Sequence, residues 1–341
     1  MENNTGKKEN VIRIEYAVIK SQLEKILRSE GFPGEKASML AKIFSDNSLF
    51  GKDSHGVNRF IPFIDSVKEG YVKINSDPVK VSGDNAIEQW DGNFGAGPLN
   101  ARFCTYRAME LAGKFDIGAV ALKNTNHWMR GGTYGWLAAE AGFALICWTN
   151  AIPTMPAWGG EEPLLGNNPL VIALPNKGNH LVLDMALSQY SYGKLEKLFQ
   201  VGQQTDYFAG YDKEGNLTKD PAAIINSKRA LPIGLWKGSG LSLMLDLIAA
   251  LFSGGKSSME IGKEKTETGV SQIFIAIKST AGKEGNDYKI INDVLNGLKL
   301  SDSRSKDNIF FPGELSVKMR DKNIQNGVPV DKNVWNKILK M

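Results

Sequence analysis

Cysteine and long apolar runs are both scarce in this chain of 341 residues. Only two cysteines occur, Cys104 and Cys147, so the sequence implies no disulfide framework and fits a reducing compartment. The longest apolar candidate, residues 241–252, is interrupted by Ser242 and Asp246 and falls short of the roughly 18 residues that span a bilayer. We therefore expect no transmembrane segment.

Charge of one sign is also missing. The net charge is only +4, and the lysines and arginines form no continuous run. Neither nucleic acid nor a membrane surface is therefore expected as a partner. The polar first residues lack the apolar segment of a signal peptide. We expect residues 1–14 to form a disordered tail and the protein to be cytoplasmic.

Several catalytic motifs are absent. The sequence contains no H-E-x-x-H and no C-x-x-C, so we expect no metal site. It contains no G-x-S-x-G, which argues against a hydrolase with a serine nucleophile. No G-x-G-x-x-G follows a predicted strand. If the chain binds a nicotinamide cofactor, it must use something other than a standard Rossmann domain.

The first 85 residues carry helical patterns. Apolar side chains recur at helical spacing from Tyr16 to Leu27, and Gly31 can end that helix. A second helix is predicted over 35–49, and a third begins near His55. We assign residues 15–85 to a helical domain that is joined by C-terminal helices from residues 286–341.

The middle of the chain alternates between strands and helices without a steady rhythm. Short apolar runs predict five strands and two helices. The strands are expected at 118–122, 143–148, 170–174, 181–185 and 272–277, and the helices at 133–141 and 241–252. We assign residues 86–285 to a sheet-containing domain. The fold class is therefore mixed α/β, of the α+β kind.

Three histidines are present, and His55 has the most suggestive neighbour. Arg59 follows it by four residues, so a helix starting here would place both on one face. Histidine transfers protons near neutral pH, and arginine binds a carboxylate through two parallel hydrogen bonds. This pair would suit a 2-keto acid. The spacing is common, however, and an ordinary solvated helix start fits it as well.

The other two histidines lie in loops. His127 follows a predicted strand and precedes Gly131 and Gly132, which permit a ligand to approach the backbone closely. A loop histidine stacked on Trp128 fits the same pattern. His180 follows a turn and leads into a strand, where an exposed side chain is the simpler interpretation.

The segment from Trp236 to Gly240 precedes a long apolar helix. Free amides at a helix start, small residues and Lys237 suit a phosphate group. An ordinary helix start with glycines for turning fits equally well.

Together these segments resemble the malate/L-lactate dehydrogenase type 2 family, a group of NAD(P)-dependent oxidoreductases without a Rossmann domain. The resemblance covers about residues 15–341. It rests on the motifs Ser54-His-Gly-Val-Asn-Arg-Phe60, Gly166-Asn-Asn-Pro169, Leu183-Asp-Met185 and Lys237-Gly-Ser-Gly240. Longer matches to one branch of the family lie at 86–91, 126–132, 146–150, 215–219 and 273–277.

The resemblance implies a role for each matching position. His55 would donate a proton to the keto oxygen, Arg59 would bind the substrate carboxylate, and Ser54 and His127 would line the pocket. The implied cofactor contacts are His180, Leu181, Val182, Leu183, Asp184, Met185, Ala186, Trp236, Lys237, Gly313 and Glu314. The cofactor would be NADH, with NADPH not excluded.

The resemblance also implies a mainly helical domain, a non-Rossmann nucleotide-binding sheet domain and a homodimer. The substrate would be a small 2-keto acid, reduced by hydride transfer. Within the family, malate, L-lactate, ureidoglycolate and cyclic imino acids stay open as alternatives. A lyase or isomerase that uses His55 and Arg59 without a cofactor is a rival from another class, and a catalytically silent binding protein is a further one.

Overall fold

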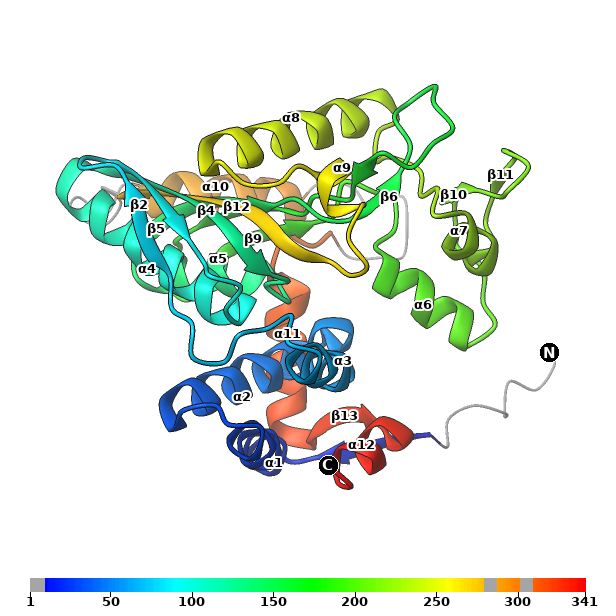
Figure 1. Ribbon diagram of the computed structural model, residues 1–341, viewed down its shortest axis with the longest axis horizontal. Coiled ribbons are helices and arrows are strands. Elements are labelled where there is room, and N and C mark those ends of the chain that lie inside the picture. Colours follow the sequence, from blue (N-terminus) through cyan, green and yellow to red (C-terminus); the bar gives the residue numbers. More distant parts are fainter. Residues whose placement is uncertain (1–9, 279–286, 301–308) are drawn as a thin grey trace.

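The computed structural model describes residues 10–278, 287–300 and 309–341. Figure 1 shows a layer of helices below a sheet that carries helices on both of its faces. This arrangement confirms the predicted mixed α/β class. The segment that carries His55 leads into α3 (Val57–Lys68), which Figure 1 shows in the helical layer on the side that faces the sheet.

The central sheet has seven strands, and only β3 and β4 run parallel to each other. All other neighbouring pairs are antiparallel, unlike the parallel sheet of a Rossmann domain. In spatial order the strands are β2 (Val79–Ser82), β3 (Ile87–Asp91), β4 (Ile117–Asn126), β12 (Thr268–Lys278), β5 (Phe143–Thr149), β8 (Leu170–Leu174) and β9 (Leu181–Met185).

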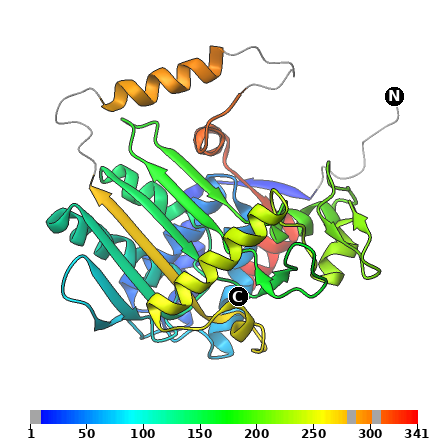
Figure 2. The ribbon, with the colours of Figure 1, turned by 90° about the horizontal axis from the view of Figure 1, so that it is seen from above.

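Both faces of this sheet are covered. Successive side chains of a strand point to opposite faces. On β12, the side chain of Phe274 packs against α4 (Gly97–Phe115) and α5 (Gly132–Glu140) on one face, whereas that of Ile273 packs against α8 (Trp236–Ser253) on the other face. Figure 2 shows α8 crossing the sheet obliquely. The five predicted strands and both predicted helices of this region are present.

The helical layer is built around a cluster of aromatic rings. Phe44 lies 5.3 Å from Phe60 and 5.2 Å from Phe63, measured between ring centroids. All three rings are buried, and this packing fixes the direction in which α3 leaves the catalytic segment. The layer comprises α1 (Tyr16–Ser29), α2 (Gly34–Leu49), the short 3-10 helix η1 (Asp53–His55), α3 (Val57–Lys68), α11 (Glu314–Asn326) and α12 (Lys332–Ile338).

The two ends of the described chain meet below this layer. Strand β1 (Val11–Ile14) pairs with β13 (Val328–Asp331), and Arg13 donates to the carbonyl of Gly327 at 2.7 Å. We had assigned residues 11–14 to the tail, and this assignment was wrong. A four-residue strand needs a partner far away in the sequence, which no local pattern reveals. Residues 1–9 lie outside the described residues.

Shorter elements complete the fold. A small lobe contains α6 (Tyr192–Gln200), α7 (Pro221–Ser227), β10 (Gly210–Tyr211) and β11 (Leu217–Thr218), and a turn at 212–216 joins the last two. The helix α10 (Asp287–Leu300), orange in Figure 2, contacts the remaining chain through the ion pair of Lys299 with Glu314. The remaining elements are β6 (Pro153–Met155), β7 (Leu165–Gly166) and α9 (Ser258–Ile261). The domain limits proposed from the sequence stay a prediction.

One predicted boundary differs. We expected Gly238 and Gly240 to precede the long helix, but α8 already begins at Trp236. A Cβ atom on Gly238 would lie 2.1 Å from the carbonyl oxygen of Ile233. Glycine is therefore needed here for close packing inside the first turn and not for turning the chain. Among the described residues, no helix is long and apolar enough to cross a membrane.

Candidate active site

His55 ends η1, and one residue, Gly56, separates it from the start of α3. Its backbone carbonyl accepts a hydrogen bond from Nδ2 of Asn47 at 2.9 Å, and Oδ1 of Asn47 accepts one from Thr133 at 2.8 Å. The segment is therefore tied to α2 and, through Asn47, to α5. Gly56 follows because a Cβ atom there would lie 2.1 Å from Oγ of Ser48.

His55 and His127 stack on each other. Their ring centroids are 5.6 Å apart and the rings are inclined by only 17°. Two histidines 72 positions apart in the sequence thus form one site, as the resemblance implied. The alternative partner that we considered for His127, Trp128, is buried against Tyr134 and Phe274 instead.

The hydrogen bonds of the two rings determine their free nitrogens. Oγ of Ser54 lies 3.0 Å from Nδ1 of His55, which leaves Nε2 of His55 free to face a substrate. Nδ1 of His127 accepts from the backbone amide of Met129 at 2.9 Å. A neutral His127 therefore carries its proton on Nε2 and is a hydrogen-bond donor there.

His127 is held in place by the residue before it. Nδ2 of Asn126 donates to the carbonyls of Tyr71, Phe94 and Gly95, while Oδ1 accepts from Thr268 at 2.9 Å. This side chain joins two loops to the ends of β4 and β12 in the buried interior. The motif residue Asn126 thus positions the histidine.

Arg59 lies one turn into α3, with an exposed side chain. Together with His127 and Glu267 it lines a cavity of about 80 Å³. Burial raises the pKa of Glu267, and the nearby charge of Arg59 opposes this rise. Sequence analysis missed Glu267, because no motif marks it and only the fold brings it to Arg59.

The electrostatic setting keeps the imidazoles neutral. Burial lowers the pKa of His55 to about 4, with Asp184 opposing and Arg59, Arg130 and Lys52 adding to the effect. Burial also holds the pKa of His127 well below its usual value, and the charge of Arg59 adds to this, as does His55 whenever it is protonated. An anion bound among these cations would favour the protonated form of His55.

Strand β9 forms the sheet edge next to this cluster. The amide of Val182 points away from β8 and donates to the carbonyl of Pro312 at 3.0 Å. Backbone directions repeat every second residue, so the amide of Asp184 points to the same open edge. The side chain of Val182 is buried in the core. Any ligand here would therefore meet the backbone of β9 and the side chain of Asp184.

Asp184 is bound to the start of α5. Its Oδ2 accepts from the amide of Gly132 at 2.9 Å, and Nε of Arg130 lies 3.9 Å from the same oxygen. A Cβ atom on Gly132 would lie 2.9 Å from this carboxylate. Sequence analysis missed Arg130 and Lys52, although Arg130 lies inside the motif at 126–132. Partial burial lowers the pKa of Lys52.

The predicted cofactor segments lie along β9. A Cβ atom on Gly313, whose φ is +98°, would lie 3.2 Å from the amide of Val182. Glu314 forms ion pairs with Lys299 and Lys318. His180 lies just before the strand, half-buried, with its ring 5.8 Å from Trp136.

At the other end of β9, Leu187 follows the strand and accepts from the amide of Ile233 at 2.8 Å. This contact brings the start of α8, with Trp236 and Lys237 exposed, close to the strand. The helix starts without a side-chain cap. The amide of Lys237 already donates to the carbonyl of Gly234 at 3.3 Å, so an anion such as a pyrophosphate would meet the remaining amides of the first turn and the charge of Lys237.

The motif at 166–169 has a structural role. Oδ1 of Asn168 accepts from the amide of Ala151 at 3.0 Å, and its Nδ2 donates to both the carbonyl and Oγ of Ser242. This buried network fastens α8 to the sheet and so fixes the helix start near β9.

The fold and the cluster define a class of protein: an enzyme with a histidine–arginine site between a helical layer and a sheet edge that suits a dinucleotide. The family model of malate/L-lactate dehydrogenase matches residues 14–339. The chain belongs to this family and is an oxidoreductase, and the family comprises NAD(P)-dependent dehydrogenases.

Similar proteins cover almost the whole chain. A 2,3-diketo-L-gulonate reductase from Pasteurella multocida is 45% identical over 331 residues, which are 96% of this chain and 99% of the relative. A 2,3-diketo-L-gulonate reductase from Haemophilus influenzae is 42% identical over 331 residues, again 96% of this chain and 99% of the relative. The crystal structure of malate dehydrogenase from Entamoeba histolytica superimposes with a TM-score of 0.92 at 26% identity and covers 97% of both chains.

Proposed function

We propose that the protein is an NADH-dependent reductase that converts 2,3-diketo-L-gulonate to 3-dehydro-L-gulonate. The observation that carries this proposal is the stacked pair of His55 and His127 with Arg59 one turn away. The long matches to the two relatives of that name support the choice of substrate. Two buried, unpaired cysteines are consistent with a cytoplasmic location.

The protein's own residues bind and protonate the substrate. Arg59 binds the carboxylate through its planar guanidinium, and Nε2 of His127 donates to a substrate oxygen. Nε2 of His55 gives its proton to the C2 keto oxygen, and Oγ of Ser54 keeps the ring oriented through Nδ1. The ketone gains this proton together with a hydride and becomes a hydroxyl group.

NADH supplies the hydride when it is bound, and we propose that it lies along β9. The backbone of 181–186 offers the open strand edge, and the start of α8 offers the amide of Trp236 and the ammonium group of Lys237 for the pyrophosphate. Gly313 permits a close approach of the chain beside His180, because a side chain there would crowd the backbone. Glu314 supports this loop by accepting from the amide of Phe311.

A screen of 2-keto acids with NADH and with NADPH tests the proposal, with cofactor oxidation followed by absorbance at equal enzyme concentration. We expect 2,3-diketo-L-gulonate with NADH to give the highest kcat/KM. L-gulonate, which has no ketone, is the matched negative control. Faster turnover of oxaloacetate or pyruvate would mean that the proposed substrate is wrong. A fluorescence titration that detects no NADH binding would refute the proposed enzyme class.

We further propose that the protein works as a homodimer. The outward face of α8 carries Leu243, Met244, Leu247 and Leu251, which are 44%, 54%, 41% and 75% exposed. Their spacing places them on one stripe of the helix. An exposed apolar stripe of this kind is suited to a two-fold contact, in which the same helix of a second copy covers it.

A further inference from the structure

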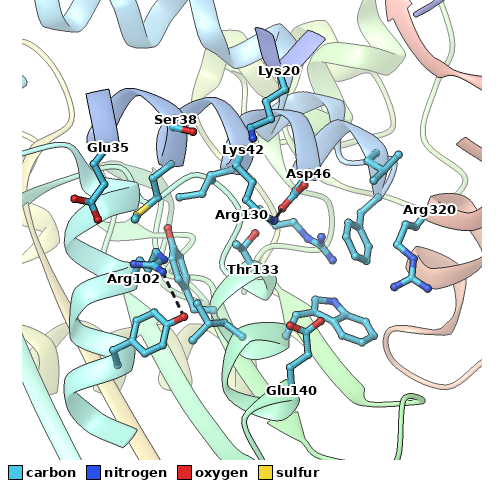
Figure 3. A pocket seen from close by; sticks show the side chains of 18 residues that line it. Lys20, Glu35, Ser38, Lys42, Asp46, Arg102, Arg130, Thr133, Glu140 and Arg320 are labelled. Atoms are coloured by element: carbon cyan, nitrogen blue, oxygen red, sulfur yellow. Dashed lines mark hydrogen bonds and ion pairs between the residues drawn. The ribbon is translucent and has the colours of Figure 1, made fainter. Parts of the chain in front are cut away.

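We propose that the protein has a second ligand site, separate from the histidine cluster, that binds a small hydroxylated organic anion such as a sugar acid or a sugar phosphate. The site is the cavity between the helical layer and the helices α4 and α5, shown in Figure 3. Nothing in the proposed reduction requires this cavity.

The cavity has the size of a ligand pocket. Its volume is about 620 Å³, within the range of small-molecule sites and well above the 80 Å³ beside Arg59. Its walls come from α1, α2, α4, α5 and α11, so five helices enclose it. Neither His55 nor His127 lines it.

Two buried donors in its wall have no hydrogen-bond partner among the described residues. They are Nε of Arg130, on a side chain that is 4% exposed, and Nε1 of Trp136, on a side chain that is 6% exposed. Leaving a buried donor unpaired is costly, more so for a charged group. Both atoms are covered by surrounding protein atoms, so a ligand with acceptor oxygens in this cavity would satisfy them once their side chains turn toward it.

The charge of the wall selects an anion. Five basic and three acidic residues line the cavity. One of the acids, Asp46, already forms an ion pair with Lys42 and accepts from the hydroxyl of Tyr16. The guanidinium groups of Arg130 and Arg320 lie 4.9 Å and 5.6 Å from the ring centroid of Phe50. This packing holds both cations at the cavity wall, where Arg130 lies 3.9 Å from Asp184 and Arg320 pairs with Asp321. Lys20 and Arg102 are the lining cations that form no ion pair with a described residue.

The remaining acids describe the rest of the ligand. Glu35 and Glu140 lie in the same wall, and neither forms an ion pair with a described residue. Carboxylates accept hydrogen bonds only, so their natural partners in a ligand are hydroxyl groups. A carboxylate or phosphate head at Arg130 with a polyhydroxylated body toward these acids matches the wall.

The site adjoins the catalytic segment. Arg130 lies in its wall and also approaches Asp184 at 3.9 Å. Thr133, another wall residue, donates to Asn47, which in turn donates to the carbonyl of His55. A ligand bound here would therefore contact residues that hold His55 and Asp184 in place.

Isothermal titration calorimetry on the full chain tests this site, with D-gluconate and D-glucose 6-phosphate as probes. We expect Arg130→Met to weaken binding of the better probe about ten-fold or more, which corresponds to about 1.4 kcal/mol. Arg320→Met, at a partly exposed position, should weaken binding of the same probe several-fold. This variant tests the site if the buried variant Arg130→Met does not fold. Lys322→Met, on the same helix but outside the cavity, is the matched control and should bind as the wild type does.

The two probes distinguish the head groups. Tighter binding of gluconate assigns a carboxylate ligand, and tighter binding of glucose 6-phosphate assigns a phosphate ligand. The proposal is overturned if neither probe binds below about 10 mM. It is equally overturned if Arg59→Met abolishes binding while Arg320→Met leaves it unchanged, because the probe then occupies the histidine cluster. Since binding is measured directly, failure of the proposed reductase activity would leave this result intact.

Discussion

At the scale of single residues, the site depends on a histidine that burial keeps neutral. His55 faces three cations and one acid, and its Nδ1 is held by Ser54. Such a ring does not carry a proton near neutral pH unless an anion joins it. The carboxylate of a 2-keto acid would be that anion, and Arg59 lies close enough in the fold to bring it there.

Replacing His55 by alanine should abolish turnover while leaving cofactor binding intact. The proton donor is lost, which costs about 10²–10⁴-fold in kcat, whereas the proposed cofactor segments do not include His55. Stopped turnover with unchanged NADH fluorescence titration is the expected pair of results. His180→Ala, at the histidine beside the proposed cofactor strand, is the comparison: it should lower the affinity for NADH and keep its kcat. Near-normal kcat in His55→Ala would remove the proton-donor role.

Replacing Arg59 by lysine should mainly raise KM. One ammonium group cannot reproduce the two parallel hydrogen bonds of a guanidinium, and the loss amounts to about ten-fold in affinity for the carboxylate. Steady-state kinetics against the 2-keto acid measures the effect. An unchanged KM would place the carboxylate elsewhere.

The pH dependence should differ between kcat/KM and kcat. The proposed reduction needs protonated His55, and burial lowers the pKa of His55 in the free enzyme to about 4. The protonated fraction therefore falls about ten-fold for each pH unit above that value, and kcat/KM falls with it. A bound carboxylate raises the pKa of His55, so the decline of kcat should begin at a higher pH. If kcat and kcat/KM declined at the same pH, the bound carboxylate would not raise the pKa of His55, contrary to this prediction.

At the scale of elements, the junction of α2, η1 and α3 determines where His55 lies. Oγ of Ser48 accepts a hydrogen bond from the amide of Val57 at 2.9 Å, and the same oxygen occupies the space that a Cβ atom on Gly56 would need. Asn47 on the same helix holds the carbonyl of His55. The last turn of α2 therefore supports both sides of the catalytic segment, although nothing in its sequence marks it as part of a site.

Gly56→Ala should displace this junction. The added methyl group would lie 2.1 Å from Oγ of Ser48 and 2.8 Å from its amide nitrogen. We expect a loss of about 1–3 kcal/mol in the free energy of unfolding, together with a strong loss of activity. Urea unfolding and kcat/KM measure the two effects.

Gly113→Ala is the matched control for this change. Gly113 lies within α4, and a Cβ atom there meets nothing within 4 Å. This variant should be as stable as the wild type or slightly more stable, since alanine favours helices. Equal stability of both variants would show that the space at Gly56 is not restricted.

At the scale of the whole molecule, α8 connects the interior with the surface. Its inner side packs on the sheet through Leu245 and Ala249, and its outer side is the apolar stripe proposed as the dimer contact. Trp236 and Lys237 at its start lie beside the proposed cofactor strand. Association of two copies and cofactor binding would thus involve the same helix.

Leu247→Glu should separate the dimer. A charge in the middle of the stripe cannot be buried without a partner, so the mass in solution should fall from that of two chains to that of one. Size-exclusion chromatography with light scattering measures this mass. Lys322→Glu, on a helix far from the stripe in the sequence, is the control for an added surface charge. A wild-type protein that is already monomeric would refute the dimer.

The sequence predicted the regular parts of this fold because each carries its own period. The helices over 16–29 and 34–49 and the strands at β5, β8 and β9 were found from apolar spacing. The helix α4 was missed, although its 19 residues make it one of the longest, because its buried face consists of small and polar residues as well as apolar ones. Strands β1 and β13 were missed because each has only four residues and is stabilised by pairing with the other, which lies far away in the sequence.

The sequence by itself determined the class of enzyme and predicted the segments proposed to carry its chemistry, because motifs such as Ser54–Phe60 are long and contiguous. Only the tertiary structure decided which distant side chains share one site. It stacked His127 on His55, brought Glu267 to Arg59, and placed Arg130 between Asp184 and a second cavity. Such contacts depend on how layers pack, and a local pattern of residues does not encode the direction in which a neighbouring layer presents its side chains.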